Sequence, residues 1–207
     1  MMGLSGLLLS TGLCLVPLPQ TGAAADSVAA LWRAGRPYAE FLAAARERRD
    51  QWLRQDSIAV LPDALAARAR GAGRWKVLVI TVHACSDSIA ILPYLARLAA
   101  AAPNLELRIA DTTGGRWLME AHRTPDGRAA TPTILILDDE LAERGCWIER
   151  PAELQRWYLE SGRRLPDDEL RRQKAAWYGR DAGRQTLEEI LAVIESAAQQ
   201  RRACPAS

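Results

Sequence analysis

The sequence predicts an α/β fold in which a mixed sheet is covered by helices on both faces. A short, β-branched apolar run at residues 77–82 is typical of a strand buried on both sides. Apolar residues then recur with helical spacing over 89–99. Two further runs, 134–137 and 141–147, are joined by acidic residues and read as an antiparallel hairpin. A chain of 207 residues is long enough for one well-packed domain.

The N-terminal stretch, residues 1–25, has no charged side chain, and its leucine-rich core is too short to span a bilayer comfortably. Ala23-Ala24-Ala25, just before Asp26, is the small-residue pattern of a signal-peptidase site. We therefore expect 1–25 to be a signal peptide and the mature protein to be periplasmic or secreted, with no stable membrane anchor. The missing basic residue near the start keeps a cytoplasmic protein as the alternative.

A helical extension is expected over residues 26–73, before the main domain at 74–198. Its helices are interrupted near Gly35-Arg36-Pro37, and a short one runs from Pro62 to Arg70. Glycines at 71 and 73 then separate the extension from the first strand.

The centre of the chain predicts a strand, a tight connection and a helix. Small or polar residues at 83–88 end the first strand, and the helix follows them. Residues 105–109 alternate as a second strand, and a helix around 117–123 includes His122 as a polar residue of an amphipathic surface. A strand, a full helix and a strand imply parallel pairing through a right-handed crossover.

The region after the hairpin predicts a helical insertion at 151–175, built from two amphipathic helices separated by Gly162 and Pro166. A last helix follows at 186–198 with a buried apolar stripe. The polar residues 199–207 are expected to form a flexible tail, with Cys204 as a bystander.

Cys85 is the reactive candidate because it lies where the central helix begins. Unpaired N–H groups at a helix N-terminus favour negative charge, which lowers the pKa of a thiol placed there and raises its thiolate fraction. A small buried thiol with no reactivity is the alternative.

Several segments around Cys85 resemble the thioredoxin superfamily, and in particular a bacterial thioredoxin-like group. The segments, which together span roughly residues 38–197, are Cys85-Ser86-Asp87-Ser88 with Pro93 five residues beyond, Ala130-Thr131-Pro132-Thr133 before an apolar strand, Gly145-Cys146-Trp147-Ile148-Glu149-Arg150-Pro151, and Trp177-Tyr178-Gly179-Arg180-Asp181-Ala182-Gly183-Arg184. The second cysteine of the family's C-x-x-C motif is serine here, and its buried acid is Val79.

The resemblance implies a thioredoxin-like three-layer fold, with Cys85 as the nucleophile. Ser88 cannot resolve a mixed disulfide, because a hydroxyl is not redox-active, but it can donate a hydrogen bond to the thiolate. Pro132 is expected to be cis, with Thr131 presenting backbone groups to an extended substrate chain. The function expected is monothiol redox chemistry on protein disulfides, oxidised thiols or glutathione adducts. The alternative is an inactive thioredoxin-fold binding or scaffolding module.

Three auxiliary residues are expected near this site. His83 would support the thiolate electrostatically if protonated, and Asp87 would cap the helix. If the hairpin turns tightly at residues 139–140, facing residues have numbers that sum to about 279, within one or two. That register sets Thr133 opposite Cys146 and brings Cys146 near Cys85 as a second thiol. The alternative is a strand cysteine packed against the sheet.

The balance of charged residues and the spacing of the cysteines argue against several classes of function. The chain has 27 basic and 25 acidic residues, so strong electrostatic attraction to nucleic acid is not indicated. The three cysteines that follow the signal peptide are not spaced as a zinc module or a disulfide scaffold. We therefore expect no metal and no cofactor.

Overall fold

The computed structural model describes residues 22–204, with side chains from Ser27 onward. Most of the expected signal peptide, residues 1–21, lies outside the described residues. The alanines of the expected cleavage site lie in the first helix, α1 (Gly22–Ala34).

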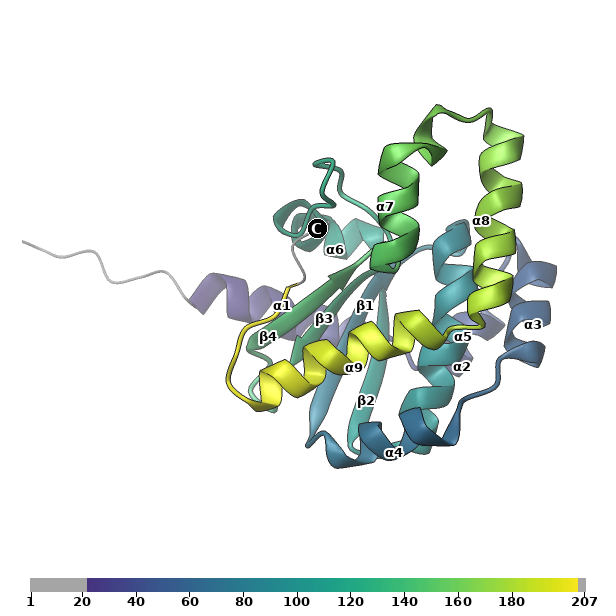
Figure 1. The fold of residues 1–207 in the computed structure, drawn as a ribbon. Helices are drawn as coiled ribbons and strands as arrows, with labels where there is room; N and C mark the ends of the chain where they lie inside the picture. Colours follow the sequence, from purple (N-terminus) through teal and green to yellow (C-terminus); the bar gives the residue numbers. More distant parts are fainter. Residues whose placement is uncertain (1–21, 205–207) are drawn as a thin grey trace, which may run out of the picture.

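The sheet has four strands in the order β2-β1-β3-β4, as Figure 1 shows. β1 (Trp75–Thr81) pairs in parallel with β2 (Leu105–Asp111) and antiparallel with β3 (Thr133–Leu137), which pairs antiparallel with β4 (Glu143–Ile148). The predicted mixed sheet, its parallel crossover and its C-terminal hairpin are confirmed.

Helices surround this sheet and account for the rest of the regular structure in residues 22–204. Besides α1 they are α2 (Tyr38–Ala43), α3 (Arg49–Ile58), α4 (Asp63–Gly71), α5 (Ser86–Ala101), α6 (Thr112–Ala121), α7 (Ala152–Glu160), the 3-10 turn η1 (Gly162–Arg164), α8 (Asp167–Asp181) and α9 (Arg184–Ala198). The second insertion helix thus continues to Asp181, beyond the predicted end at 175.

The two faces of the sheet carry two separate apolar clusters. Alternate residues of β1, such as Val77 and Val79, pack with helices α2–α5 and α7–α9. Leu78 and Ile80 face the other way, toward α1 and α6. The period-two alternation of a strand thereby divides one apolar run between two cores, which gives the predicted three layers (Figure 1).

Helix α6 begins directly after β2, five residues before the predicted segment at 117. The Asp111 carboxylate accepts the N–H groups of Thr113 at 2.8 Å and Gly114 at 3.1 Å, which caps the helix. Gly115 lets this helix approach β1, since a Cβ there would lie 2.4 Å from the Ile80 side chain.

The C-terminal residues 199–204 are not the free tail that we expected. Ala203 forms a parallel bridge with Gly145, and its carbonyl accepts the Cys146 N–H at 3.0 Å. Arg202 pairs with Glu143 at 2.9 Å. Residues 201–204 therefore return along the outer edge of β4.

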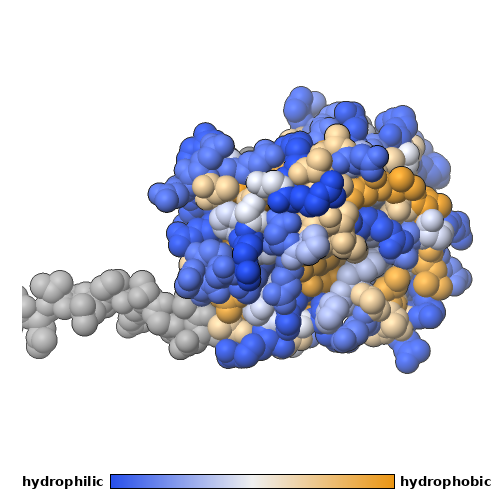
Figure 2. Space-filling view, turned by 90° about the horizontal axis from the view of Figure 1, so that it is seen from below, coloured by the Kyte–Doolittle hydropathy of each residue, from blue (hydrophilic) through white to orange (hydrophobic). Residues whose placement is uncertain are grey.

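The surface of the described residues is mostly hydrophilic in the view of Figure 2, with hydrophobic side chains gathered toward the side where α3 and α4 lie. Leu53, Ile58 and Val60 are the most exposed large apolar residues. Within residues 22–204, no helix combines the length and the apolar character needed to cross a membrane.

Candidate active site at the N-terminus of α5

Cys85 is the N-cap residue of α5 and the free thiol of the described part of the chain. Its sulfur accepts the Ser88 N–H at 3.4 Å and donates to the Thr131 carbonyl at 3.2 Å. The side chain is partly exposed. The sulfur therefore lies beside the unpaired N–H groups of the first helical turn, with its hydrogen directed to the Thr131 carbonyl.

The loop before β3 forms the other wall of the site. The Thr131–Pro132 peptide bond is cis. The Pro132 carbonyl accepts the Glu149 N–H at 2.8 Å, and the Thr133 hydroxyl donates to the Ala130 carbonyl at 2.8 Å. These bonds hold the Thr131 carbonyl next to Cys85.

Ser88 contacts the sulfur through its backbone, and its hydroxyl points elsewhere. The side chain is fully buried and shares a 2.5 Å hydrogen bond with the Thr81 hydroxyl at the end of β1. Thr81 was not singled out from the sequence, because a threonine at a strand end has no local signature of such a partner.

Asp87 does not cap α5 as predicted, since the Cys85 sulfur occupies the cap. The Asp87 side chain is 7% exposed and turns toward the insertion. It accepts the Tyr178 hydroxyl at 2.8 Å and Lys174 Nζ at 2.7 Å, and Arg150 Nη2 lies 3.6 Å away. Burial and the neighbouring carboxylate raise the pKa of Tyr178 well above its usual range, so its hydroxyl remains a donor.

A chain of charged residues continues behind Asp87, from the buried Glu149 and Arg150 to the partly exposed Arg128 and Asp126. Glu149 pairs with Arg150 and accepts two hydrogen bonds from Arg128, at 3.0 and 2.8 Å. Arg128 also binds Asp126 at 2.7 Å, which lowers the pKa of that carboxyl to about 2. With Asp87 and Lys174 included, three acids face three bases, so each buried charge has compensation.

The network joins three segments that are far apart in sequence. Each belongs to one of the segments quoted above for the family resemblance. Asp87 comes from the helix start, Arg150 from the end of β4, and Tyr178 from α8. Arg150 also lies 4.2 Å over the ring of Tyr158 on α7. The insertion is therefore tied to the first turn of the Cys85 helix.

The His83 ring is held by α2, and its electrostatic support of the Cys85 thiolate stays a prediction. Its ring stacks on Phe41 at a centroid distance of 4.1 Å, and Nε2 donates to the Phe41 carbonyl at 2.9 Å. The His83 carbonyl accepts the indole N–H of Trp52 at 2.9 Å. This histidine fastens α2 and α3 to the sheet.

Cys146 is not a second thiol for Cys85, because it forms a disulfide with Cys204. Cys146 faces Leu135, and paired residue numbers sum to 281, two more than a tight turn gives. Cys85 contacts Thr131, whereas Cys146 pairs with Leu135, four residues further along the chain. At the rise of a strand, this offset amounts to about 13 Å. A strain-free Cys85–Cys146 bridge needs Cα atoms within about 7 Å.

A groove of about 490 Å³ lies between α3, α8 and the first two turns of α5, beside Ser86. Four of the described residues that line it are basic and none is acidic; the basic ones are Arg48, Arg54, Arg171 and Lys174. Apolar side chains, including Ile89 and Leu170, line it as well. Such a groove suits an amphipathic ligand with negative charge.

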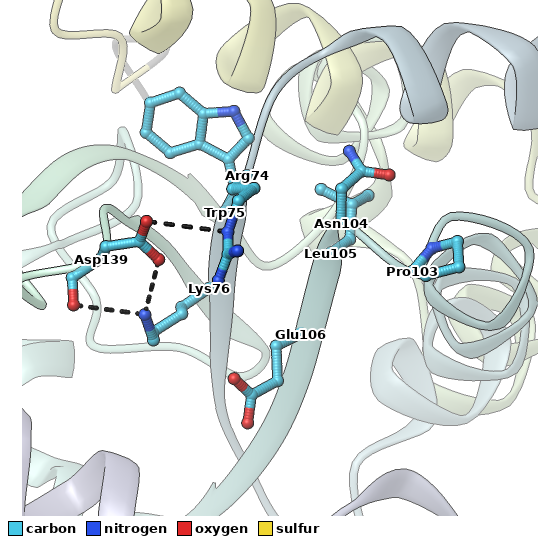
Figure 3. Close-up of a pocket in the computed structure, with 8 residues that line it drawn as sticks. All are labelled: Arg74, Trp75, Lys76, Pro103, Asn104, Leu105, Glu106 and Asp139. Carbon is cyan, nitrogen blue, oxygen red and sulfur yellow. Dashed lines mark hydrogen bonds and ion pairs between the residues drawn. The ribbon is translucent and has the colours of Figure 1, made fainter.

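A second hollow, of about 590 Å³, lies where β1 and β2 begin, at the opposite end of the sheet from Cys85. Figure 3 shows Lys76 reaching across to Asp139, whose carboxylate is 3.0 Å from Nζ. Because that lysine is already paired and no thiol lines the hollow, we assign no chemistry to it.

Comparison with known proteins was made on the sequence and on the fold. A family model described as Thioredoxin matches residues 35–171. A Pseudomonas aeruginosa protein of unknown function, PA1234, has a solved structure with a TM-score of 0.62 and 25% identity, covering 82% of this chain and 97% of its own. An HIV epitope-scaffold shares the fold at a TM-score of 0.61 and 23% identity, covering 81% of this chain and 97% of its own.

Among curated proteins, none matches this chain. The family model nevertheless spans well over half of the sequence, and it includes the Cys85 helix, the proline loop and the hairpin. The mixed sheet, the helices on both faces and the cysteine at the start of α5 agree with that match. The chain therefore belongs to the thioredoxin superfamily.

Proposed function

We propose that the protein carries out monothiol exchange with disulfides through Cys85. The observation that carries this proposal is the position of the Cys85 sulfur, between the Ser88 N–H and the Thr131 carbonyl of the proline loop. The first group favours the thiolate, and the second lies where an extended substrate chain would pair with Thr131.

The reaction has two steps with no net change in the protein. The Cys85 thiolate attacks one sulfur of a disulfide, forms a mixed disulfide and releases the other sulfur as a thiolate. An external thiolate then attacks the mixed disulfide and frees Cys85. Ser88 cannot perform this second step. Cys146 cannot either, because it is bonded to Cys204 and lies about 13 Å along the sheet from the Cys85 site. The mixed disulfide therefore persists until an external thiol attacks it.

The basic groove beside Ser86 favours negatively charged disulfides. A substrate there would place carboxylates beside Arg48 and Arg54, while its disulfide approaches the start of α5. Glutathione disulfide, or an acidic segment of a protein substrate, has this character.

The test is to mix the protein with glutathione disulfide, with uncharged hydroxyethyl disulfide and with cationic cystamine, and to follow adducts by intact mass. We expect a long-lived adduct on Cys85 that forms fastest with glutathione disulfide. Cys85→Ser should form none, whereas Arg54→Gln should slow only the anionic reagent. If wild-type protein forms no adduct with any reagent at alkaline pH, the binding or scaffolding module becomes the better function.

A further inference from the structure

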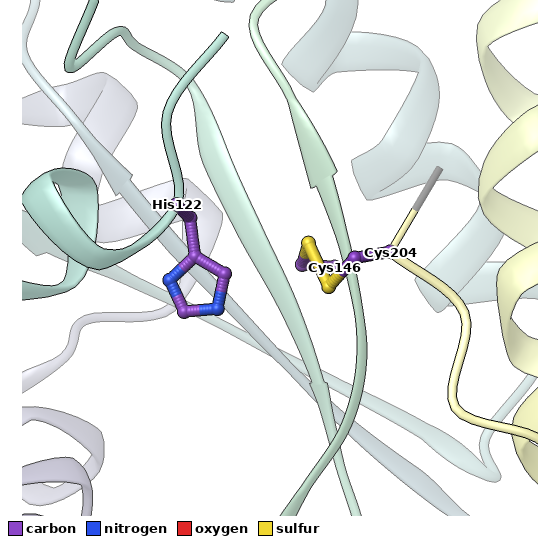
Figure 4. A group of neighbouring side chains, drawn as sticks. All are labelled: His122, Cys146 and Cys204. Carbon is purple, nitrogen blue, oxygen red and sulfur yellow. A yellow bond between two sulfur atoms is a disulfide. The ribbon is translucent and has the colours of Figure 1, made fainter. Parts of the chain in front are cut away.

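A second group of reactive side chains lies on the edge of the sheet, away from Cys85. His122, Cys146 and Cys204 place one nitrogen and two sulfur atoms all within 4.8 Å of one another. Figure 4 shows the imidazole at the end of α6 beside the disulfide between β4 and the C-terminal segment. The monothiol chemistry proposed for Cys85 uses none of these residues.

His122 has the orientation of a metal-binding histidine. Its Nδ1 lies 2.8 Å from the Leu118 carbonyl, which can only accept, so Nδ1 carries the hydrogen. The other ring nitrogen, Nε2, faces Glu143 Oε1 at 3.0 Å, and since a carboxylate only accepts, Nε2 must give up its hydrogen to bind a metal ion. Metal-bound histidines are commonly fixed by this kind of hydrogen bond from the second ring nitrogen.

Glu143 borders this group with a carboxylate that reaches two of its three members. Its Oε1 is 3.0 Å from His122 Nε2 and 3.8 Å from the Cys204 sulfur. The Glu143 side chain is 18% exposed and that of His122 is 9% exposed, so the group is sheltered from solvent. Two sulfurs, one imidazole and one carboxylate are the donor types that Zn²⁺ binds tetrahedrally.

The elements that carry these donors are held together independently of the disulfide. The Cys146 N–H donates to the Ala203 carbonyl at 3.0 Å, and Arg202 pairs with Glu143 at 2.9 Å. Opening the disulfide would therefore leave the two sulfurs near each other. Two thiolates on one zinc ion lie about 3.8 Å apart, as Zn–S bonds of about 2.3 Å require in a tetrahedron.

We infer that His122, Cys146, Cys204 and Glu143 form a zinc site that is available only when the disulfide is reduced. A dithiol reductant passes two electrons to the Cys146–Cys204 bond and becomes a disulfide itself. The two thiols and His122 Nε2 then each release a proton as they bind the ion. A small-molecule disulfide that takes up two electrons and becomes two thiols reforms the Cys146–Cys204 bond and expels the metal, so the C-terminal segment exchanges one crosslink for the other.

A disulfide that only fastens the C-terminal segment would need no histidine beside it, and this difference makes the inference testable. The protein is reduced, freed of reductant under anaerobic conditions and titrated with Co²⁺, whose visible absorption reports tetrahedral thiolate ligands. We expect one Co²⁺ per chain, displaced by one Zn²⁺, and none in the oxidised protein.

Two variants separate the site from the Cys85 chemistry. Cys85→Ser should bind Co²⁺ as wild type does, whereas His122→Ala should bind it at least about 100-fold more weakly, since even residues behind a metal ligand cost 10–100-fold. Because His122→Ala retains both cysteines, circular dichroism of its oxidised form checks that it folds.

Unchanged Co²⁺ affinity in reduced His122→Ala would overturn the inference, as would a spectrum without tetrahedral thiolate character. Co²⁺ binding by the oxidised protein would contradict it equally. Loss of binding in Cys85→Ser would show that the metal lies at the other thiol. None of these outcomes depends on whether Cys85 exchanges disulfides.

Discussion

The two places where the structure holds cysteine sulfur differ in what surrounds that sulfur. Cys85 faces backbone groups, the N–H of Ser88 and the carbonyl of Thr131, and has no partner thiol within residues 22–204. Cys146 faces another cysteine, brought by a segment 58 residues further along the chain. The same side chain is thus a free thiol at a helix start and a crosslink at a sheet edge. The difference arises from placement, because the thiol chemistry is identical.

Ser88→Cys would break this contrast most strongly, by giving Cys85 a partner of its own. A thiol one helical turn away attacks the mixed disulfide as if present at molar concentration or above. We expect release of the adduct to accelerate roughly 1,000-fold over release by 1 mM external thiol. Quenched-flow mass spectrometry of the glutathione adduct measures this rate.

Ser88→Ala is the matched control for that variant, because it removes the same hydroxyl from Thr81 without adding sulfur. Its adduct should persist as in wild type. Equal release rates in the cysteine and alanine variants would show that position 88 cannot reach the mixed disulfide.

Cys204→Ser should affect stability and leave the reactivity of Cys85 unchanged. A crosslink spanning 58 residues lowers the entropy of the unfolded chain by an amount worth about 4 kcal/mol. We expect that loss in the free energy of unfolding, measured with urea under oxidising conditions. Reductant should bring wild type to the level of the variant, and labelling of Cys85 should proceed equally in both. A change in labelling rate would mean that the two sites communicate.

Asp87→Asn tests whether the buried charges maintain the Cys85 site. The change leaves Lys174 and Arg150 without their carboxylate in a buried setting, which costs about 3 kcal/mol of unfolding free energy. It should also shift the pH dependence of Cys85 labelling, since a charge in the first turn of α5 changes. Glu169→Gln, at an exposed ion pair on α8, is the control and should change neither quantity.

The smallest effect is expected at the outer end of the network, from Asp126→Asn. The Arg128 hydrogen bond depresses the folded pKa of Asp126 to about 2. A depressed acid pKa stabilises the fold above the unfolded pKa of about 3.9, and the contribution disappears as pH falls toward 2.

Because the Arg128 side chain is 39% exposed, solvent screening reduces this contribution to about 1 kcal/mol. Urea unfolding at pH 7, 5 and 3 should show the difference between wild type and Asp126→Asn shrinking below pH 4. A difference that grows in acid would contradict the assignment.

The local order of the chain could be predicted from the sequence because it depends on near neighbours. The run at 77–82 predicted β1, and the polar break at 83–88 placed Cys85 at a helix start. Period-two and helical spacing are properties of short segments, so they can be recognised in a sequence without knowledge of the fold. The mixed sheet and the place of Cys85 at a helix start follow from them.

The register of the hairpin needed the folded structure. The Asp138 carboxylate accepts the N–H groups of Glu140 at 3.0 Å and Ala142 at 2.8 Å, and Leu141 has a φ of 63°. These contacts make a wider loop than the expected two-residue turn, and a register shift lies at residues 136/137. The pairing therefore moves by two residues, which carries Cys146 away from the Cys85 end of the sheet.

The partners of Cys146 and Asp87 were likewise decided by tertiary structure. Cys204 reaches Cys146 only because the segment after α9 folds back along β4, and Lys174 reaches Asp87 only because α8 packs near the start of α5. The sequence by itself determined which residues carry the chemistry, since side-chain type and local periodicity are written in it. Which of them meet depends on contacts across sequence separations of 58 residues (Cys146–Cys204) and 87 residues (Asp87–Lys174). Only the packing of the whole chain fixes those contacts.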